Sequence, residues 1–411
     1  MKAIPFREIE GRSAGYYMLV GILGVLVLIG AACAFTMEHH GHYITGMSNQ
    51  VIWGMPHVFA VFLIIAASGV LNVASIASVF GRAMYKPLAR LSALLAVCLL
   101  AGGLIVLVLD LGRPDRLIVA MTYYNFKSIF AWNIILYTGF FAVVIVYLWM
   151  MMERRMNMFS KPVGVFAFVW RLILTTGTGS IFGFLVAREA YDTSLLAPLF
   201  IVMSFSFGLA IFLLVLFAAY RWTGRPLGDA VVARLKNLLA VFVSAVLYFI
   251  LVFHLTNLYM TEKHAVEKFL LLDGGIYTTL FWLGFIVVGS LVPLTIFFSR
   301  LGKSRLMVAL GAVLVILGGM AQVYVIIIGG QAYPLEMFPG KTVSSSFFDG
   351  VVAAYTPTPY EFGLGIGGVA LALIMAVIAI RVLPFLPLNL GDDVADPHHG
   401  RSAGTAEPAG A

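Results

Sequence analysis

The chain has 411 residues, of which 61% are hydrophobic and only 11% are charged. This balance excludes a soluble globular enzyme and is typical of a polytopic integral membrane protein. The net charge of +7 does not indicate a nucleic-acid partner, because the basic residues fall in loops between apolar segments, where such residues set membrane topology. Both cysteines, Cys33 and Cys98, lie inside apolar segments, and the sequence contains no CxxCH haem-attachment motif and no cysteine ligand set for an iron–sulfur cluster.

Ten segments are long and apolar enough to cross a bilayer, which takes about 20 residues per helix. In chain order they cover residues 15–36, 51–80, 91–111, 129–152, 162–187, 196–220, 238–260, 276–299, 307–329 and 363–383. We therefore predict an all-α fold in which residues 15–388 form one membrane domain of ten helices. Residues 1–14 form a short tail, and residues 389–411, which lack apolar periodicity, are predicted to be a disordered tail.

The distribution of basic residues predicts the orientation of these helices. Most Lys and Arg residues fall in the loops that share a side with the N-terminus, which places both termini in the cytoplasm of a bacterial inner-membrane protein. Most acidic residues fall at or beyond the opposite face. The longest loop on that outer face, Gly330–Phe362, is long enough to form a lid or a docking surface. We expect a substrate or partner to meet the protein there.

Polar side chains from several predicted helices lie at similar depth near the outer face. The second helix carries His57 about 7 to 8 Å below that face, and the seventh carries His254 about 9 Å below it. Asn257 follows His254 by one turn, Asp110 ends the third helix, and Asn133 begins the fourth. Ionisable groups inside a membrane are functional candidates by default.

Three functions compete for this outer layer. The two histidines could ligate one b-type haem, or they could line a transport path. Alternatively, histidine and aspartate could exchange protons with a quinone head group held by aromatic and aliphatic walls. For Asn257, Gln322 and Asn133 taken singly, hydrogen bonds between helices without any chemistry are also plausible.

Arg171 lies about 13 Å into the fifth helix, close to the middle of the membrane, where an unpaired charge is costly. It either extends toward the cytoplasmic face or binds backbone carbonyls, or it belongs to a path for protons or ions. Thr175, Thr176 and Thr178 continue that path toward the outer face.

A polar loop before the second helix holds three histidines within four positions: His39, His40 and His42. Histidine-rich tracts of this kind bind metals in some proteins and are plain solvated loops in others. Both interpretations are consistent with the sequence.

Two motifs carry a resemblance to a known family. One is Asp110-Leu-Gly-Arg113-Pro-Asp-Arg116, and the other runs from Trp53 to His57. Together they resemble the NrfD-like membrane subunits, which include that of polysulfide reductase, and within that family the DsrP type of the DsrMKJOP complex. The resemblance covers nearly all of the sequence except its last twenty residues or so. One departure lies in the following loop, where the family's S-P-M-S-W-G is replaced by the stretch from Lys127 to Asn133.

The resemblance implies a quinone-interacting subunit, for menaquinone or ubiquinone, without haem or iron–sulfur clusters of its own. It implies a complex with an extracytoplasmic four-cluster iron–sulfur protein, a multihaem cytochrome c and other membrane and cytoplasmic subunits, in sulfur metabolism. It further implies that His57 contacts the quinone, that Trp53 and Asp110 belong to the same site, and that Arg113 positions Asp110 or the partner. His254 has no counterpart in the family pattern.

The competing class is a secondary transporter or ion-conducting protein. Its signature would be paired broken helices at mid-depth in two related halves. Gly177–Gly183 is one glycine-rich interruption, but the sequence offers no convincing partner for it in a matching half.

Overall fold

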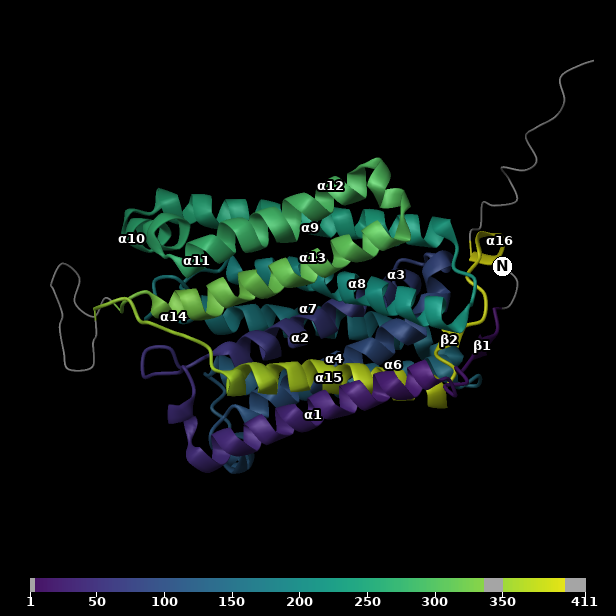
Figure 1. Cartoon of the computed structure of the whole chain (residues 1–411), viewed down its shortest axis with the longest axis horizontal. Coiled ribbons are helices and arrows are strands. Elements are labelled where there is room, and N and C mark those ends of the chain that lie inside the picture. The colour runs from purple at the N-terminus through teal and green to yellow at the C-terminus, as the bar shows by residue number, and fades with distance from the viewer. Residues whose placement is uncertain (1–3, 336–349, 396–411) are drawn as a thin grey trace, which may run out of the picture.

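The computed structural model describes residues 4–335 and 350–395. In that part of the protein ten apolar helices lie side by side along one common direction, which confirms the predicted all-α fold of ten spans (Figure 1). The chain is therefore a multi-pass integral membrane protein. The observed spans are Ala14–His40, Met55–Ser78, Ala83–Leu109, Ile129–Met152, Asn157–Gly183, Leu196–Thr223, Asp229–Tyr259, Ile276–Phe298, Arg305–Ala332 and Pro359–Val382.

Several spans are made of more than one regular element. The long α-helices are α1 (Ala14–His40), α2 (Met55–Val70), α4 (Ala89–Leu109), α6 (Ile129–Met152), α7 (Ser160–Gly183), α8 (Leu196–Thr223), α9 (Asp229–Tyr259), α13 (Arg305–Tyr324) and α15 (Pro359–Val382). Shorter pieces complete the second, eighth and ninth spans: α3 (Asn72–Ser78), α11 (Ile276–Thr279), α12 (Val292–Phe298) and α14 (Gly330–Ala332), with π-helical stretches at Leu280–Leu291 and Val325–Gly329. Outside the spans lie α5 (Leu117–Thr122), α10 (His264–Lys268) and α16 (Asp392–Ala395).

The second span is the centre of the molecule. Of its most apolar 18 residues, 89% are buried within the protein, against 17% for α1 at the periphery. α2 packs against α4, α8 and α15, and α1 lies outside α15 (Figure 1). The closest approach is between α2 and α8 at Gly69 and Gly208, where a side chain on either residue would collide with the backbone of the other helix. Small residues at helix crossings are the usual means of tight packing in membranes.

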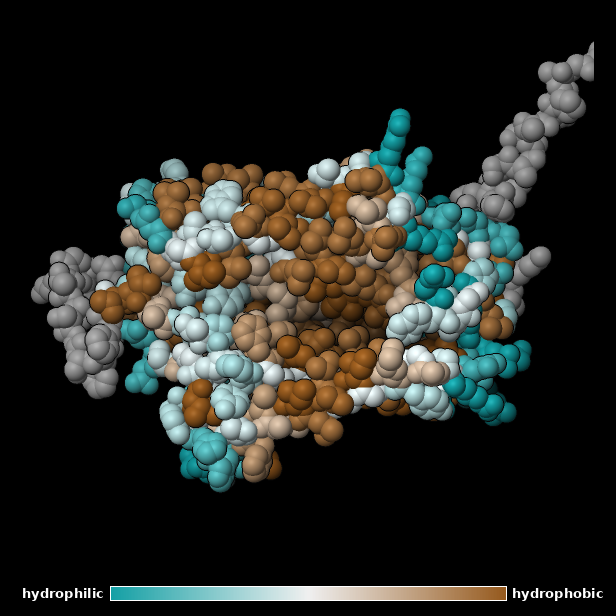
Figure 2. Space-filling model, in the orientation of Figure 1, coloured by the Kyte–Doolittle hydropathy of each residue, from teal (hydrophilic) through white to brown (hydrophobic). Residues whose placement is uncertain are grey.

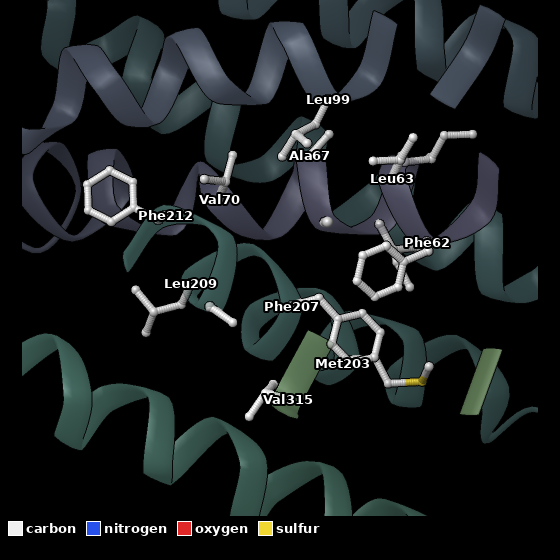
Figure 3. Packing of buried hydrophobic residues seen from close by; sticks show 14 of the residues in the cluster. Phe62, Leu63, Ala67, Val70, Leu99, Met203, Phe207, Leu209, Phe212 and Val315 are labelled. Atoms are coloured by element: carbon white, nitrogen blue, oxygen red, sulfur yellow. The ribbon is translucent and has the colours of Figure 1, made fainter. Parts of the chain in front are cut away.

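Aromatic and aliphatic side chains fill the space on either side of this glycine contact. Phe62 of α2 stacks on Phe207 of α8 with ring centroids 5.0 Å apart, and Met203 and Leu209 continue the same layer (Figure 3). Their rings and chains interdigitate at the density of a protein interior. The packing holds α2 rigidly and thereby fixes the residues at its outer end.

The first and last described residues lie at one end of the helix bundle (Figure 1). β1 (Phe6–Arg7) pairs antiparallel with β2 (Leu386–Pro387), so the N-terminal tail and the segment after α15 are held together. On the face seen in Figure 2, the middle of the bundle is apolar and most hydrophilic side chains lie toward its two ends. This distribution matches a hydrocarbon layer between two aqueous phases.

The predicted start of a disordered tail at residue 389 is wrong, because residues 389–395 are held in the fold. Asp392 accepts hydrogen bonds from the backbone N–H groups of Asp229 and Ala230, at 3.2 and 2.9 Å, and Ala395 is fully buried. The first turn of a helix leaves N–H donors without partners, and a carboxylate satisfies them. The tail therefore caps α9 as far as residue 395. Residues 396–411 lie outside the described part of the protein, as do residues 336–349 of the predicted outer loop.

Candidate functional site

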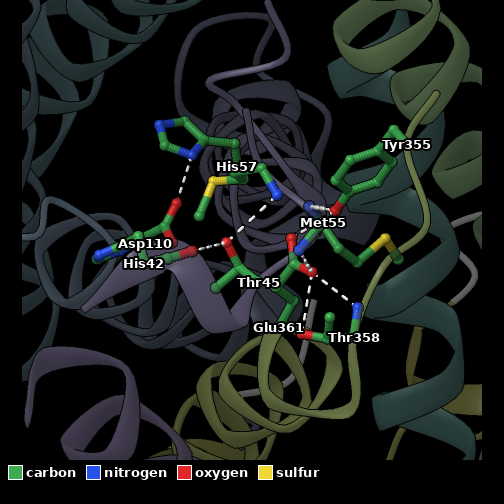
Figure 4. A network of polar contacts seen from close by, with 10 residues as sticks. His42, Thr45, Met55, His57, Asp110, Tyr355, Thr358 and Glu361 are labelled. Atoms are coloured by element: carbon green, nitrogen blue, oxygen red, sulfur yellow. Dashed lines mark hydrogen bonds and ion pairs between the residues drawn. The ribbon is translucent and has the colours of Figure 1, made fainter. Parts of the chain in front are cut away.

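His57 and Asp110 meet at the outer end of the bundle. The residue that begins α2 is Met55, not residue 51, so His57 lies only about 3 Å along the helix and closer to the surface than the sequence suggested. Asp110 immediately follows α4, which packs against α2. Nδ1 of His57 is 2.6 Å from Oδ2 of Asp110, and the carboxylate is fully buried (Figure 4). The structure thus brings together the two leading residues of the predicted site.

A second histidine, which the sequence did not place here, approaches the same carboxylate. Nε2 of His42 lies 3.7 Å from Oδ1 of Asp110. His42 belongs to a short turn, His42–Ile44, that is closed by a hydrogen bond of 2.6 Å from the Thr45 hydroxyl to the His42 carbonyl. Gly112, with a φ of +70°, faces the His42 ring, and a side chain there would press on the imidazole. The glycine of the Asp-Leu-Gly-Arg motif therefore allows the close approach of His42.

The contacts among His42, His57 and Asp110 favour a charged carboxylate and a charged imidazole. Burial tends to raise the pKa of Asp110, but contacts with His42 and His57 outweigh it and hold that pKa below its ordinary value. In turn, the contact with Asp110 raises the pKa of His42 in spite of partial burial. An ionised carboxylate between two imidazoles is the arrangement that orients a histidine for proton transfer.

Several polar atoms of His57 and Asp110 make no regular hydrogen bond. Neither carboxylate oxygen of Asp110 makes a hydrogen bond of regular angle within the described residues, although both are buried. Among the same residues, Nδ1 of His57 faces Asp110 at 2.6 Å and is likewise buried without a hydrogen bond of regular angle, and no hydrogen bond of Nε2 is observed. Buried polar atoms are almost always satisfied by protein, water or ligand. The site therefore fits a small molecule that hydrogen-bonds to an imidazole.

Trp53 forms an aromatic wall beside His57. Its ring stacks on the imidazole with centroids 6.0 Å apart and an interplanar angle of 27°, and it contacts Phe182 edge-on at 5.6 Å. Gln331 of α14 fixes the backbone of Trp53: its side-chain oxygen accepts from the Trp53 N–H at 3.0 Å, and its amide donates to the Trp53 carbonyl at 3.0 Å. The predicted role of Trp53 beside the histidine agrees with this geometry.

Residues at the start of α15 also hold this site in place. Glu361 is fully buried and accepts hydrogen bonds from the Tyr355 hydroxyl at 2.6 Å and the Gly46 N–H at 3.0 Å. The Tyr355 hydroxyl also accepts from the Met55 N–H at 2.6 Å, in the first turn of α2 (Figure 4). Glu361 thereby ties together the loop of His42, the start of α2 and α15. Thr358, three residues earlier, forms a capping box with Glu361, and that spacing is a signal that the sequence does contain.

Arg113 and Asn133 were predicted in the same site, but their contacts point elsewhere. Arg113 forms an exposed ion pair with Asp115 at 3.0 Å rather than a contact with Asp110, so of its two expected roles the positioning of a partner stays a prediction. The Asn133 amide donates to the carbonyls of Ile129 and Gly177, at 2.9 and 3.1 Å, and so links α6 to α7. The alternative of an interhelical hydrogen bond therefore describes Asn133 well.

His254 and Asn257 form a separate polar group. Nδ1 of His254 lies 2.6 Å from one carboxylate oxygen of Glu267, and the Asn257 amide donates to the other at 2.7 Å. These residues belong to α9 and α10, and α8 packs against both α9 and α2. Each histidine thus faces a carboxylate of its own, and the structure does not support one haem shared between them. Hydropathy predicts the depth of His254 but not the side of its helix from which it projects.

Arg171 lies fully buried in the middle of α7, and in the described residues it has no carboxylate partner. One guanidinium nitrogen donates to Oδ1 of Asn72 at 2.5 Å and another to the Ser68 carbonyl at 3.4 Å. The guanidinium also lies over the rings of Phe168 and Phe205, at 4.8 and 5.1 Å. Asn72 and Ser68 flank Leu71, where α2 ends and α3 begins. The arginine therefore ties α7 to the second span beside the break at Leu71.

The loop histidines do not form a metal-binding cluster within the described residues. The rings of His39 and His40 contact each other edge-on with centroids 5.1 Å apart, while His42 faces Asp110. His42 therefore belongs to the site at the head of α2, and neither of the sequence-based interpretations of this loop described it.

Comparison with known proteins gives a consistent set of relatives. Residues 43–334 match the family described as Polysulphide reductase, NrfD. The chain is 28% identical over 398 residues to the Hdr-like menaquinol oxidoreductase integral membrane subunit of Archaeoglobus fulgidus, a match that covers 96% of this chain and 100% of that protein. It is 26% identical over 311 residues to one component of the polysulfide reductase of Wolinella succinogenes, with 69% and 96% covered. A component of the selenate reductase of Mesobacillus selenatarsenatis is 21% identical over 403 residues, with 88% and 93% covered.

Proposed function

The chain belongs to the NrfD (polysulphide reductase) family, and on that premise we propose that it is the quinone-reactive membrane subunit of an oxidoreductase complex. In this proposal it exchanges electrons between membrane quinone and an extracytoplasmic iron–sulfur protein. The observation that carries the proposal is the pair of His57 and Asp110, in which the carboxylate orients the imidazole and leaves Nε2 free for a ligand. The names of relatives that belong to menaquinol, polysulfide and selenate oxidoreductases support it.

The protein's own contribution is proton transfer at the quinone oxygens. Oxidation of a quinol releases two electrons and two protons, and the electrons pass to the partner protein. Nε2 of His57 accepts one proton from a quinol hydroxyl, and Asp110 stabilises the imidazolium that results. The imidazolium releases this proton to the outer aqueous phase, and the second proton follows by the same route. In the opposite direction the same nitrogen donates the proton. Trp53 supplies a flat apolar wall for the ring, as expected for a site that holds a planar ligand.

The finer assignments rest on the resemblance of the motifs. We propose menaquinone as the quinone, because the name of one relative contains menaquinol; ubiquinone is the other choice. The proposed partners are a four-cluster iron–sulfur protein, a multihaem cytochrome c and further subunits, as in complexes of the DsrP type that act in sulfur metabolism. A bacterial inner-membrane location with cytoplasmic termini belongs to the same proposal.

The test is replacement of His57 in the purified complex. We expect His57→Ala to lower quinone turnover by about 100-fold or more, since general acid–base catalysis contributes about 10²–10⁴-fold. His40→Ala is the matched control, because His40 lies on the same face and does not contact Asp110. Both variants must retain the partner subunits. Turnover that survives His57→Ala unchanged in the assembled complex would remove the central proposal.

A second candidate function is transport, and one observation favours it. The second span is broken at Leu71 near mid-membrane, where Arg171 binds the Ser68 carbonyl, and transporters commonly build ion sites at such breaks. Purification under mild conditions separates the two candidates. Bound quinone together with iron–sulfur absorbance supports the oxidoreductase subunit, whereas an isolated protein without cofactors supports the transporter.

Proton translocation across the membrane forms the last part of the proposal. A quinone that reacts at the outer face exchanges its protons there, so charge separation needs a route from the inner face. We assign that route to the surroundings of Arg171, where the Ser68 carbonyl and Asn72 accept from the guanidinium, while the Ser68 and Thr175 hydroxyls donate to the Arg171 backbone carbonyl. The arginine stays ionised and does not itself carry the proton.

A further inference from the structure

A groove opens at the end of the bundle opposite to His57, between the C-terminal part of α8 and the N-terminal part of α13. Its volume is about 600 Å³, within the range of about 300–1,000 Å³ that ligand sites occupy. Leu214 and Phe217 of α8 and Leu306 and Ala309 of α13 line its apolar part. The space-filling view shows this face hollowed above α8, with apolar side chains inside the hollow (Figure 2). The groove therefore faces the hydrocarbon layer.

The rim of the groove toward the termini is basic. Arg221, Arg225 and Arg305 all line it, with Asp229 as the acidic residue that pairs with Arg305 at 2.6 Å. Arg225 is occupied by backbone carbonyls, among them those of Arg7 and Glu8. Arg221 is exposed and, within the described residues, forms no ion pair or hydrogen bond. One guanidinium at the rim is thus free to bind an anion.

Trp222, beside Arg221, lines the same rim and is 66% exposed. Tryptophan concentrates at the level of the lipid head groups, where its ring is apolar and its N–H meets water. Arginine binds phosphate through two parallel N–H donors. The groove is therefore apolar within the membrane and cationic at the surface. A matching ligand has hydrocarbon chains for the apolar part and an anionic group for the basic rim.

We propose that this groove binds an anionic phospholipid of the inner leaflet. Its acyl chains lie along Leu214, Phe217 and Leu306, and its phosphodiester binds the Arg221 guanidinium next to Trp222. Basic pockets between membrane helices on the cytoplasmic side are suited to such head groups. A quinone lacks the anionic end, and a zwitterionic lipid would place a second cation among the arginines. The lipid would join α8 to α13 at the end of the bundle away from the quinone site.

The experiment measures phospholipid retained by the protein when it is purified with its accompanying subunits in a mild detergent. After delipidation, phosphatidylglycerol is added back and the bound amount is determined by mass spectrometry, with phosphatidylcholine of the same acyl composition as the head-group control. We expect Arg221→Gln to weaken phosphatidylglycerol binding by about fivefold, the effect of one basic residue near an anionic surface. Arg300→Gln is the matched control, since Arg300 is exposed at the same end of the bundle and does not line the groove.

A second variant tests the apolar part without altering charge. Ala309→Trp fills the groove and should lower phosphatidylglycerol binding as well, while Arg221→Lys should retain more of it than Arg221→Gln. Equal loss in Arg221→Gln and Arg300→Gln, or no loss in either, overturns the proposal. So does equal binding of phosphatidylcholine, or a crosslink from a Leu306→Cys variant to another protein subunit, which would show that a protein occupies the groove.

Discussion

At the scale of single residues, some members of the site near the start of α2 could be identified from the sequence and others could not. His57 and Asp110 were identifiable because ionisable side chains next to long apolar segments are rare, and the structure places their atoms 2.6 Å apart. His42 was not identifiable as their neighbour, because its position depends on the turn that follows α1. Glu267 lies between two of the predicted spans, yet it is fully buried against His254. Loop paths and helix rotation decide both contacts, and neither is encoded in hydropathy.

The contact between His42 and Asp110 predicts a dependence of stability on pH. Because the folded pKa of His42 is raised above 6.5, the stabilisation is complete below that pH and is lost as pH rises through the folded value. It is also lost as pH falls through the folded pKa of Asp110, which lies below 3.8. The window of stabilisation thus lies between the lowered carboxylate pKa and the raised imidazole pKa.

We therefore expect His42→Gln to lower the melting temperature of the purified complex more at about pH 5.5 than at about pH 8.5. The effect should correspond to no more than about 1 kcal/mol, as for other partly exposed ion pairs. Thermal unfolding followed across this pH range measures it, with His39→Gln as the comparison, since His39 does not contact Asp110. A difference between His42→Gln and the unchanged protein that is the same at both pH values would show that the pair does not titrate as described.

At the scale of helices, length and hydropathy predicted where each helix lies in the sequence but not which helices are its neighbours. All ten spans were located, because about 20 apolar residues are needed to cross the hydrocarbon layer. The start of the second span was wrong by four residues, because Gln331 and Tyr355 hold the preceding loop in an extended path up to Met55. The break at Leu71 was also missed. Ser92 of α4 stabilises it by donating to the Val70 carbonyl at 2.7 Å and accepting from the Ala74 N–H at 3.2 Å.

The contact of α2 with α8 gives a prediction about stability. At Gly69 an added methyl group would overlap the Ser204 carbonyl of α8, and backbone cannot move aside as a side chain can. We expect Gly69→Ala to lower the free energy of unfolding by about 1–3 kcal/mol or more, the range for overpacked cores. Thermal unfolding in detergent measures the change. Gly21→Ala on α1 is the control, since nothing lies within 4 Å of the added methyl group there; equal effects of the two substitutions would argue against a tight helix crossing.

At the scale of the whole molecule, the polar residues lie at two levels. The groups of His57 and His254 lie near the predicted outer face, and Arg171 lies at mid-depth. The position of Arg171 midway along its helix was predictable, because each residue of a helix advances by about 1.5 Å, whereas the depth of His57 was overestimated because α2 begins at Met55. Which groups face each other depends on how the ten helices are arranged around α2, and this arrangement was not predictable from one sequence. It separates His254 from His57, and it brings Arg171 of α7 to the broken second span, just inward of which Asn72 lies.

In the proposed function, Arg171 links the quinone site to the opposite face of the membrane. Its guanidinium has no carboxylate partner in the described residues, and its Nε makes no hydrogen bond there, so the charge is balanced only by dipoles and aromatic rings. Such a site stabilises water and tunes nearby proton carriers.

We expect Arg171→Leu to lower the number of protons moved per electron while quinone turnover is largely retained. Thr176→Val is the control on the same helix, because Thr176 is exposed and its hydroxyl bonds only to the Leu172 carbonyl. Proteoliposomes that hold the whole complex and an internal pH dye report both quantities, and a parallel fall of proton movement and turnover, or no change in either, would show that Arg171 has only a structural role.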